Sequence, residues 1–191
     1  MKILFATGNI NKAKEVSSML PQEFELLSLK DIELTEDIPE TSATIEGNAI
    51  QKANYITEHF GMDCFADDTG LEIIALNNEP GVYSARYAGD HRSDEDNMAL
   101  VQERLADKED RSARFKTVIA LNLNGTQHLF EGIVEGKIVE EKRGTNGFGY
   151  DPIFEPENCG KTFAELSMEE KNSMSHRARA FKKMISFLES L

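Results

Sequence analysis

The sequence predicts an α/β protein with a mixed sheet, because short apolar runs alternate with longer segments of helical spacing. Lys2 to Ala6 is an apolar run, and Ala13 to Leu20 then carries apolar residues at helical spacing. Further along, two apolar runs flank Asn124-Gly125, a dipeptide typical of tight hairpin turns. The first pair of segments indicates a strand followed by a helix, and the second indicates antiparallel strands with long central members.

The composition is that of an ordinary globular protein. The 191 residues are 40% hydrophobic and 29% charged, which fits a single domain over residues 1–191. The net charge of −13 argues against binding to nucleic acid or to an anionic membrane, because both require a basic surface. Cys64 and Cys159 lie in unlike contexts, so we expect free thiols. With an N-terminus that reads as a strand and no apolar run of transmembrane length, we expect a cytoplasmic protein.

The segment Thr7 to Lys12 forms a glycine-containing turn between the first strand and the first helix. Such a turn directs backbone N–H groups and the helix dipole at an anion, and Lys12 adds a cation for a phosphate oxygen. It lacks the longer glycine loop of a P-loop. The alternative is a plain turn in which Asn9 or Asn11 caps the helix.

The next segments are a strand, an acidic loop and a helix. Phe24 to Leu29 predicts the strand, residues 31–40 the loop, and Ile45 to Phe60 the helix. Glu40 ends the loop, and Lys52 lies off the apolar stripe of the helix. The simplest interpretation of Glu40 is a carboxylate near the N-terminus of the helix, where the helix dipole favours it. The simplest interpretation of Lys52 is a cation on the solvent-exposed face of the helix.

The stretch Cys64 to Ile73 is the centre of the predicted chemistry. An apolar strand is expected to end at Asp67 and Asp68. Carboxylates at the end of a buried strand are costly unless they hold a cation or a proton, so this is a place for chemistry with Mg²⁺ or water. The alternative is a turn whose Asp side chains accept hydrogen bonds from local backbone N–H groups.

The later elements follow from the same local signals. Residues 82–89 hold two tyrosines and an arginine among small residues, and the sequence leaves their role open. The predicted elements are a helix from Ser93 to Leu105, strands at Phe115 to Leu123 and Gln127 to Ile133, an extension from Gly136 to Glu141, a helical region opened by a capping box at Ser167, and a second helix that Ser175 would cap.

The segment Arg143 to Phe154 alternates glycines with aromatic residues. Glycines let the backbone approach a ligand closely, and aromatic rings stack on planar bases. The alternative is a turn whose aromatic side chains pack inward. A basic segment near the C-terminus contains Lys171, His176 and Arg177, and its plain interpretation is a solvated basic helix.

These residues alone indicate a Mg²⁺-dependent enzyme that acts on a nucleotide or phosphate ester. One alternative is a phosphatase that forms an aspartyl phosphate, although that class requires Asp-x-Asp and the pair here is adjacent. Another is a nucleotide sensor without catalysis.

Five motifs occur in the order found in the inosine triphosphate pyrophosphatase family, which the chain resembles over nearly its whole length. The motifs are Thr7-Gly8-Asn9-x-x-Lys12, Ala66 to Leu71, Pro80 to Tyr87, Gly147 to Phe154, and Ser175-His176-Arg177. That family hydrolyses ITP, dITP and XTP to the monophosphate and pyrophosphate, which clears deaminated purines from the nucleotide pool. The resemblance implies an elongated α/β fold, with a mixed sheet flanked by helices and two lobes around a central nucleotide cleft. It also implies a homodimer.

The resemblance further implies the site. Glu40 and Asp68 would bind Mg²⁺, and Asp68 would also take a proton from the attacking water. A carboxylate bound to Mg²⁺ is a poorer base, so the main role of Asp68 stays open. A donor such as Arg177 or a backbone N–H would select the purine O6. The nearest alternative function is a pyrophosphatase for pyrimidine or modified nucleotides. The substrate contacts implied are Thr7, Gly8, Asn9, Ile10, Asn11, Lys12, Lys52, Thr69, Phe148, Gly149, Tyr150, Asp151, Lys171, His176 and Arg177.

Overall fold

A computed structural model of the protein describes residues 2–191, which divide into two compact units. Unit 1 comprises the chain up to Asp68 together with Thr117–Gly132 and Arg177–Leu191. Unit 2 comprises Thr69–Lys116 and Ile133–His176. The chain passes between the units four times. Three crossings lie within long strands, β3 (Cys64–Ile73), β5 (Ser112–Leu123) and β6 (Thr126–Ile138), and the fourth lies between His176 and Arg177.

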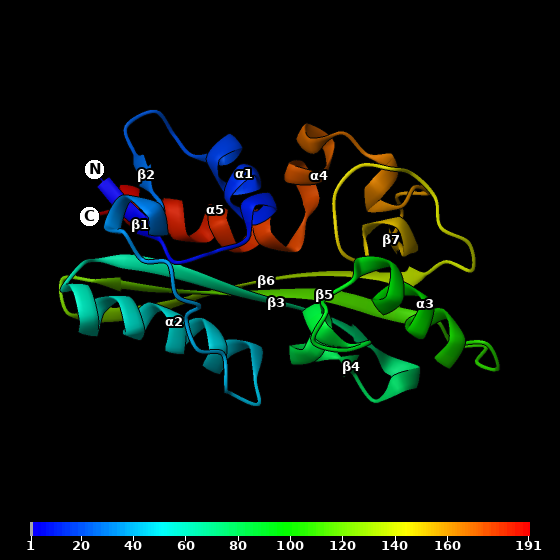
Figure 1. The fold of residues 1–191 in the computed structure, drawn as a ribbon. Helices are drawn as coiled ribbons and strands as arrows, with labels where there is room; N and C mark the ends of the chain where they lie inside the picture. The colour runs from blue at the N-terminus through cyan, green and yellow to red at the C-terminus, as the bar shows by residue number, and fades with distance from the viewer. Residues whose placement is uncertain (1) are drawn as a thin grey trace. The chain divides into compact units, whose positions relative to one another are not determined.

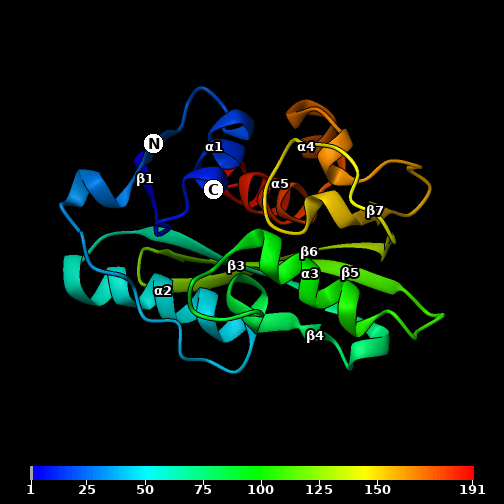
Figure 2. The same cartoon turned by 45° about the vertical axis from the view of Figure 1, so that its right-hand side comes forward.

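Unit 1 is built on parallel strands. β1 (Lys2–Phe5) pairs in parallel with β2 (Glu25–Leu27) and with β3. In this unit α1 (Ile10–Met19) and α5 (His176–Glu189) lie on one face of the strands, and α2 (Ile45–Phe60) lies on the other (Figures 1 and 2). Because helices cover both faces, the strands are apolar almost throughout, as buried parallel strands require.

Local capping sets the ends of the helices in unit 1. The side chain of Asn9 accepts from the backbone N–H groups of Asn11 and Lys12, so α1 begins at Ile10, earlier than its apolar spacing predicts. Thr44 caps the start of α2, and Gly61 adopts the left-handed conformation (φ 63°) that ends it.

Unit 2 carries the antiparallel pairs. β4 (Glu79–Pro80) pairs with β3, and β7 (Phe154–Pro156) pairs with β6. α3 (Asp94–Arg104) and α4 (Met168–Met174) lie on opposite sides of the strands of this unit (Figures 1 and 2). Its core contains Phe115 in edge contact with Phe154, with ring centroids 4.7 Å apart.

The predicted fold class is confirmed. Over the described residues the strand order is β2-β1-β3-β5-β6-β7, with β4 paired to β3, so the sheet is mixed and helices flank it. The Asn124-Gly125 hairpin joins β5 to β6 as predicted. Short 3₁₀ helices occur at Leu29–Ile32, Ile74–Leu76, Gly81–Arg86, Asp151–Ile153 and Phe163–Glu165.

The expectation that the strand ends at the paired carboxylates is wrong. β3 continues through Asp67 and Asp68 to Ile73, where Glu72 and Ile73 pair with β4. The side chains of consecutive residues in a strand point to opposite faces, so the two carboxylates enter different surroundings.

Other local predictions hold. Ser167 and Glu170 form the capping box of α4, and α5 begins directly after Ser175. Cys64 and Cys159 are free thiols. Within residues 2–191 no helix has the length and apolar character needed to span a membrane.

Candidate active site

The first part of the candidate site is the turn at the end of β1. Thr7 Oγ1 accepts from the backbone N–H of Asn9, and Asn9 in turn caps α1. Gly8 is exposed, as is Ile10 (66%), so this turn offers its backbone to solvent in front of a helix N-terminus. That arrangement suits an anion.

Nothing within unit 1 explains why residue 8 is a glycine. Its φ lies outside the left-handed region, and no atom lies within 4 Å of the position that a Cβ would occupy. A glycine with neither conformational nor packing cause is expected where a ligand approaches the backbone closely.

Gly8→Ala is therefore expected to fold normally and to lose substrate affinity. We predict an increase in KM for ITP of about ten- to a hundredfold, since a Cβ would push a bound phosphate away from the backbone N–H groups and weaken its hydrogen bonds. Gly61→Ala is the matched control, because that glycine also has open space but adopts φ 63°. The control should lower Tm and leave KM unchanged, and a Gly8→Ala enzyme with wild-type KM would contradict a phosphate at this turn.

Asp67 lies on the side of β3 that meets α1 and α5. Its carboxylate, 1% exposed, accepts from Lys12 Nζ at 3.1 Å and from Arg177 Nε at 3.0 Å. Arg177 also donates to Glu15, which is buried. Burial opposes ionisation of Asp67, but the charges of Lys12 and Arg177 outweigh it and hold its pKa well below the usual range. The four groups form a chain of alternating charge, in which Lys12 is partly buried and Asp67, Arg177 and Glu15 are buried.

Asp68 enters a different environment, formed by α2. Asn48 Nδ2 donates to its carboxylate at 3.3 Å, and Lys52 Nζ lies 3.8 Å away. Burial raises the pKa of Asp68, and this outweighs the attraction of Lys52 and Lys12. The adjacent carboxylates thus have pKa values displaced in opposite directions, a pattern that assigns them different roles.

Lys52 connects Asp68 to Glu40. The lysine is buried (7% exposed), and its Nζ donates to Glu40 Oε1 at 2.5 Å. Burial would favour neutral Lys52, but Asp68 and Glu40 outweigh it and raise its pKa, so the side chain is a buried cation. The plain interpretation of Lys52 as a solvated cation is therefore wrong.

Glu40 and Asp68 fit a magnesium ion in their donor chemistry. Both present carboxylate oxygen, the ligand type that Mg²⁺ prefers, and Mg²⁺ is commonly held by one or two carboxylates plus substrate phosphates. Across residues 2–191 no group of three or more His, Cys, Asp or Glu side chains gathers as a complete metal centre. The pair therefore fits a metal that depends on the substrate for further ligands.

In unit 2 the segment Phe148–Asp151 is held by buried polar contacts. Asp151, 2% exposed, accepts from Lys171 Nζ at 2.6 Å and from the backbone N–H of Phe148 at 3.0 Å. Lys171 also lies 4.9 Å from the ring centroid of Phe148, within cation–π range. Tyr150 is buried as well and donates its hydroxyl to the carbonyl of Ser84 at 2.7 Å. These contacts fix the backbone of the segment, while Phe148 and Gly149 stay partly exposed.

The three predicted basic residues near the C-terminus are buried, so a solvated basic helix is the wrong interpretation for Lys171, His176 and Arg177. His176 belongs to unit 2 and stacks on Phe115, with ring centroids 4.5 Å apart. Arg177 belongs to unit 1, where Asp67 and Glu15 engage its guanidinium. Its expected contact with the purine O6 stays a prediction.

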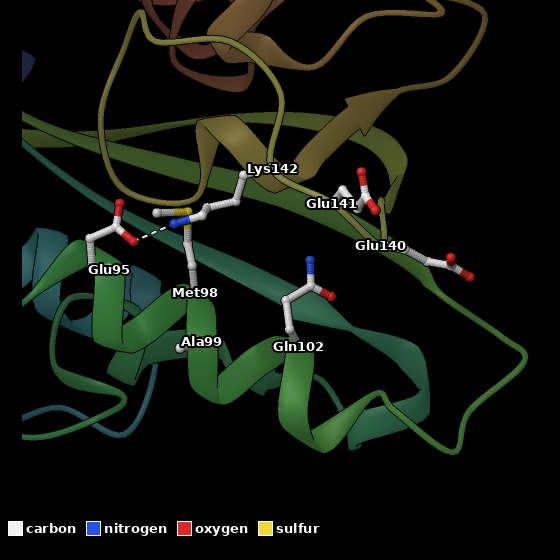
Figure 3. A pocket seen from close by; sticks show the side chains of 7 residues that line it. All are labelled: Glu95, Met98, Ala99, Gln102, Glu140, Glu141 and Lys142. Atoms are coloured by element: carbon white, nitrogen blue, oxygen red, sulfur yellow. Dashed lines mark hydrogen bonds and ion pairs between the residues drawn. The ribbon is translucent and has the colours of Figure 1, made fainter.

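A separate hollow of about 320 Å³ in unit 2 lies between α3 and the segment after β6 (Figure 3). An ion pair between Lys142 and Glu95 crosses it. None of the predicted site residues lines it, and its lining residues are Glu95, Met98, Ala99, Gln102, Glu140, Glu141 and Lys142. With three carboxylates and a paired lysine it is unsuited to a phosphate.

Sequence reasoning missed Glu15 and Asn48 in unit 1. Asn48 precedes Lys52 by one helical turn, so the shared face of α2 is a signal that could have found it. Glu15 follows Lys14 in a helix and reads as a solvated charge, so no local signal marks its burial against Arg177.

The comparisons with known proteins agree on one family. The model of the Ham1 family matches residues 3–187. A dITP/XTP pyrophosphatase of Flavobacterium johnsoniae is 58% identical over 188 residues, covering 98% of both chains. The enzyme of the same name from Flavobacterium psychrophilum is 57% identical over 190 residues and covers both chains fully. A solved HAM1 protein from Coxiella burnetii superposes with a TM-score of 0.92 at 40% identity over the full length of both chains. With a family model that spans nearly the whole chain and relatives this similar, the protein belongs to the Ham1 family.

Proposed function

We propose that the protein hydrolyses deaminated purine nucleoside triphosphates, ITP, dITP and XTP, to the monophosphate and pyrophosphate. The observation that carries the proposal is a pair of lysines near an open glycine turn: Lys12 is paired with Asp67, and the buried Lys52 lies beside Asp68. Two fixed ammonium groups near the exposed backbone N–H groups of a helix N-terminus suit a polyanionic ligand such as a triphosphate. The relatives named dITP/XTP pyrophosphatase support the choice of base.

The triphosphate would bind at the turn of unit 1. Backbone N–H groups at the start of α1 and the ammonium groups of Lys12 and Lys52 would neutralise its oxygens. These donors are fixed before the substrate arrives: Asp67 holds Lys12, and Glu40 holds Lys52. Preorganised donors of this kind stabilise charge that develops on the pyrophosphate leaving group.

Asp68 is the better candidate for the base. A water oxygen would attack the α-phosphorus while the bond from that phosphorus to the α–β bridging oxygen breaks, and pyrophosphate departs with the bond's electron pair. Asp68 would take a proton from the water, because in the absence of metal its raised pKa makes it the more basic of the two aspartates. Asp67 is committed to Lys12 and Arg177.

We propose Mg²⁺ as the cofactor, held by Glu40 and Asp68. When bound, it would neutralise phosphate charge and lower the pKa of the attacking water. The proposal predicts that a chelator abolishes turnover, and that Glu40→Gln raises the Mg²⁺ concentration needed for half-maximal rate. The same metal response in wild type and Glu40→Gln would argue against Glu40 as a ligand.

Unit 2 would supply the recognition of the base. The resemblance implies that Phe148 to Asp151 surround the purine. The ring of Phe148 would offer a face for stacking, and a backbone N–H of this segment would be able to donate to the purine O6. Adenine presents an amino donor where hypoxanthine presents O6, so each such donor discriminates by about ten- to a hundredfold.

Analysis of the products by ion exchange tests the proposal. With Mg²⁺ and ITP we expect IMP and pyrophosphate, and with ATP in parallel we expect little turnover. IDP and orthophosphate would instead support a phosphatase. Absence of turnover with ITP, followed by a positive result on a panel of modified and pyrimidine nucleotides, would move the assignment to another base.

We further propose a homodimer in the cytoplasm. Ile74 (59% exposed) and Tyr83 (54% exposed) are large apolar side chains left open in unit 2, as a contact between copies requires. The free thiols support a reducing compartment. Light scattering should give twice the mass of the chain, and a monomer at micromolar concentration would contradict the dimer.

A further inference from the structure

The sequence motif Pro80–Tyr87 takes no part in the proposed chemistry, yet it contains a buried polar centre at Ser84. Ser84 Oγ donates to the carbonyl of Gly81 at 2.6 Å and accepts from the backbone N–H of Leu71 at 2.9 Å. The carbonyl of Ser84 accepts the hydroxyl of Tyr150 at 2.7 Å. Ser84 thus connects β3, the 3₁₀ helix Gly81–Arg86 and the glycine-rich segment. The hydrogen bond from Tyr150 to Ser84 is the first tether of the glycine-rich segment.

Asn97 of α3 fixes this centre from a second direction. It is 2% exposed, and its amide nitrogen donates to the carbonyls of Ser84 and Ala85 at 3.4 and 3.2 Å. Its amide oxygen accepts from the backbone N–H of Ala88 at 2.7 Å. A buried side chain with three backbone partners specifies one local conformation, because any rearrangement leaves polar groups unpaired.

A second tether reaches the glycine-rich segment from the start of α3. Asp94 accepts from the backbone N–H of Gly149 at 2.8 Å. Gly149 has φ 62° and no atom within 4 Å of a Cβ position, so packing does not hold it in place. Two neighbouring residues, Gly149 and Tyr150, are therefore held through α3 and the residues bound to it.

We propose that Ser84, Asn97 and Asp94 are positioning residues for substrate selection, acting on the segment Phe148–Asp151. This inference rests on the proposed function, in which that segment binds the base. Backbone donors and a stacking ring select a base only when they are held to within about half an ångström, and glycines supply no such restraint themselves. The two tethers supply this restraint on the backbone of Phe148–Asp151. The role of the motif around Ser84 is therefore to position that segment.

Tyr150→Phe removes the first tether and no other atom. We expect KM for ITP to rise about three- to tenfold, as the loss of one buried hydrogen bond predicts, with kcat within about twofold of wild type. Inhibition by inorganic tripolyphosphate, which has no base, should keep its wild-type Ki. Tyr87→Phe is the matched control, since it removes a hydroxyl that donates to Glu79 at 2.9 Å, and its KM should be unchanged.

The second tether has its own variants. Asp94→Ala should raise KM for ITP, whereas Asp94→Asn keeps an acceptor oxygen and should restore most of the affinity. Glu95→Ala removes the same charge from the same helical turn without touching Gly149, so its KM should match wild type.

The outcomes separate the two hypotheses. Absence of ITP turnover by the wild-type protein would overturn the proposed function and this inference with it. Normal wild-type turnover, with unchanged KM in both Tyr150→Phe and Asp94→Ala, would overturn the positioning role alone. A rise in KM accompanied by an equal rise in the Ki of tripolyphosphate would also overturn it, because that result indicates general damage.

Discussion

Asp68→Asn is expected to lower kcat for ITP by about 10²- to 10⁴-fold, the usual contribution of a positioned general base. The substitution keeps the size of the side chain and an oxygen that can accept from Asn48, which donates at 3.3 Å. It removes the proposed general base and one of the two candidate metal ligands. Tm should therefore stay close to wild type while turnover collapses.

Steady-state kinetics with ITP and a thermal unfolding scan check this prediction together. Binding of tripolyphosphate in the presence of Mg²⁺ separates the roles of Asp68, because loss of a pure base leaves that affinity unchanged whereas loss of a metal ligand weakens it. If Asp68→Asn retained more than about a tenth of wild-type kcat, another group would have to act as the base.

Asp67→Asn, the same change at the adjacent position, is expected to destabilise the fold. It leaves the charges of Lys12 and Arg177 without the carboxylate that both contact at 3.0–3.1 Å in a buried site. Removing one member of a buried ion pair costs about 3–5 kcal/mol of unfolding free energy. Urea unfolding measures the loss. The control is Glu25→Gln, whose pair with Lys2 is exposed and should change stability by less than about 1 kcal/mol.

The difference in unfolding free energy between wild type and Asp67→Asn is also expected to depend on pH. The pKa of Asp67 is lowered in the folded state, so its stabilisation is fully present above the unfolded pKa of about 3.9 and is lost as the pH falls below that value. The difference in stability between wild type and Asp67→Asn should be constant from pH 7 to 5 and should shrink below about pH 4. A difference that grows with acid, or no difference at pH 7, would contradict the buried network.

Much of the fold follows from local signals that the sequence carries openly. The bounds predicted for α2, Ile45 and Phe60, match the structure because Thr44 and Gly61 fix its two ends. The hairpin at Asn124-Gly125 was predictable because the turn needs residues that tolerate positive φ, and both have it. α1 was predicted too short, because the cap at Asn9 outweighs the weak apolar spacing of its first turn.

The parts that sequence reasoning missed depend on pairing between distant positions. β3 runs past its carboxylates because Lys12, Lys52 and Arg177 compensate them, and these come from three different helices. Glu15 and Arg177 are 162 positions apart. The residues adjacent to each in the sequence therefore do not predict that its side chain is buried.

The candidate site was predictable in its residue types but not in its contacts. The resemblance supplied the residues, and the structure adds which partners they engage. Phe148 and Gly149 are partly exposed to solvent. The polar groups of Tyr150, Asp151 and Lys171 instead form buried hydrogen bonds within unit 2. Burial of that kind has no local signature in a segment where glycines and aromatics alternate.

The position of bond cleavage is the central claim, and hydrolysis of ITP in ¹⁸O-labelled water tests it most directly. Attack at the α-phosphorus places one labelled oxygen in IMP and leaves pyrophosphate unlabelled, and that is the result predicted here. Label in pyrophosphate with unlabelled IMP would place the attack at the β-phosphorus. That result would contradict the roles assigned to Asp68 and to the turn at Gly8.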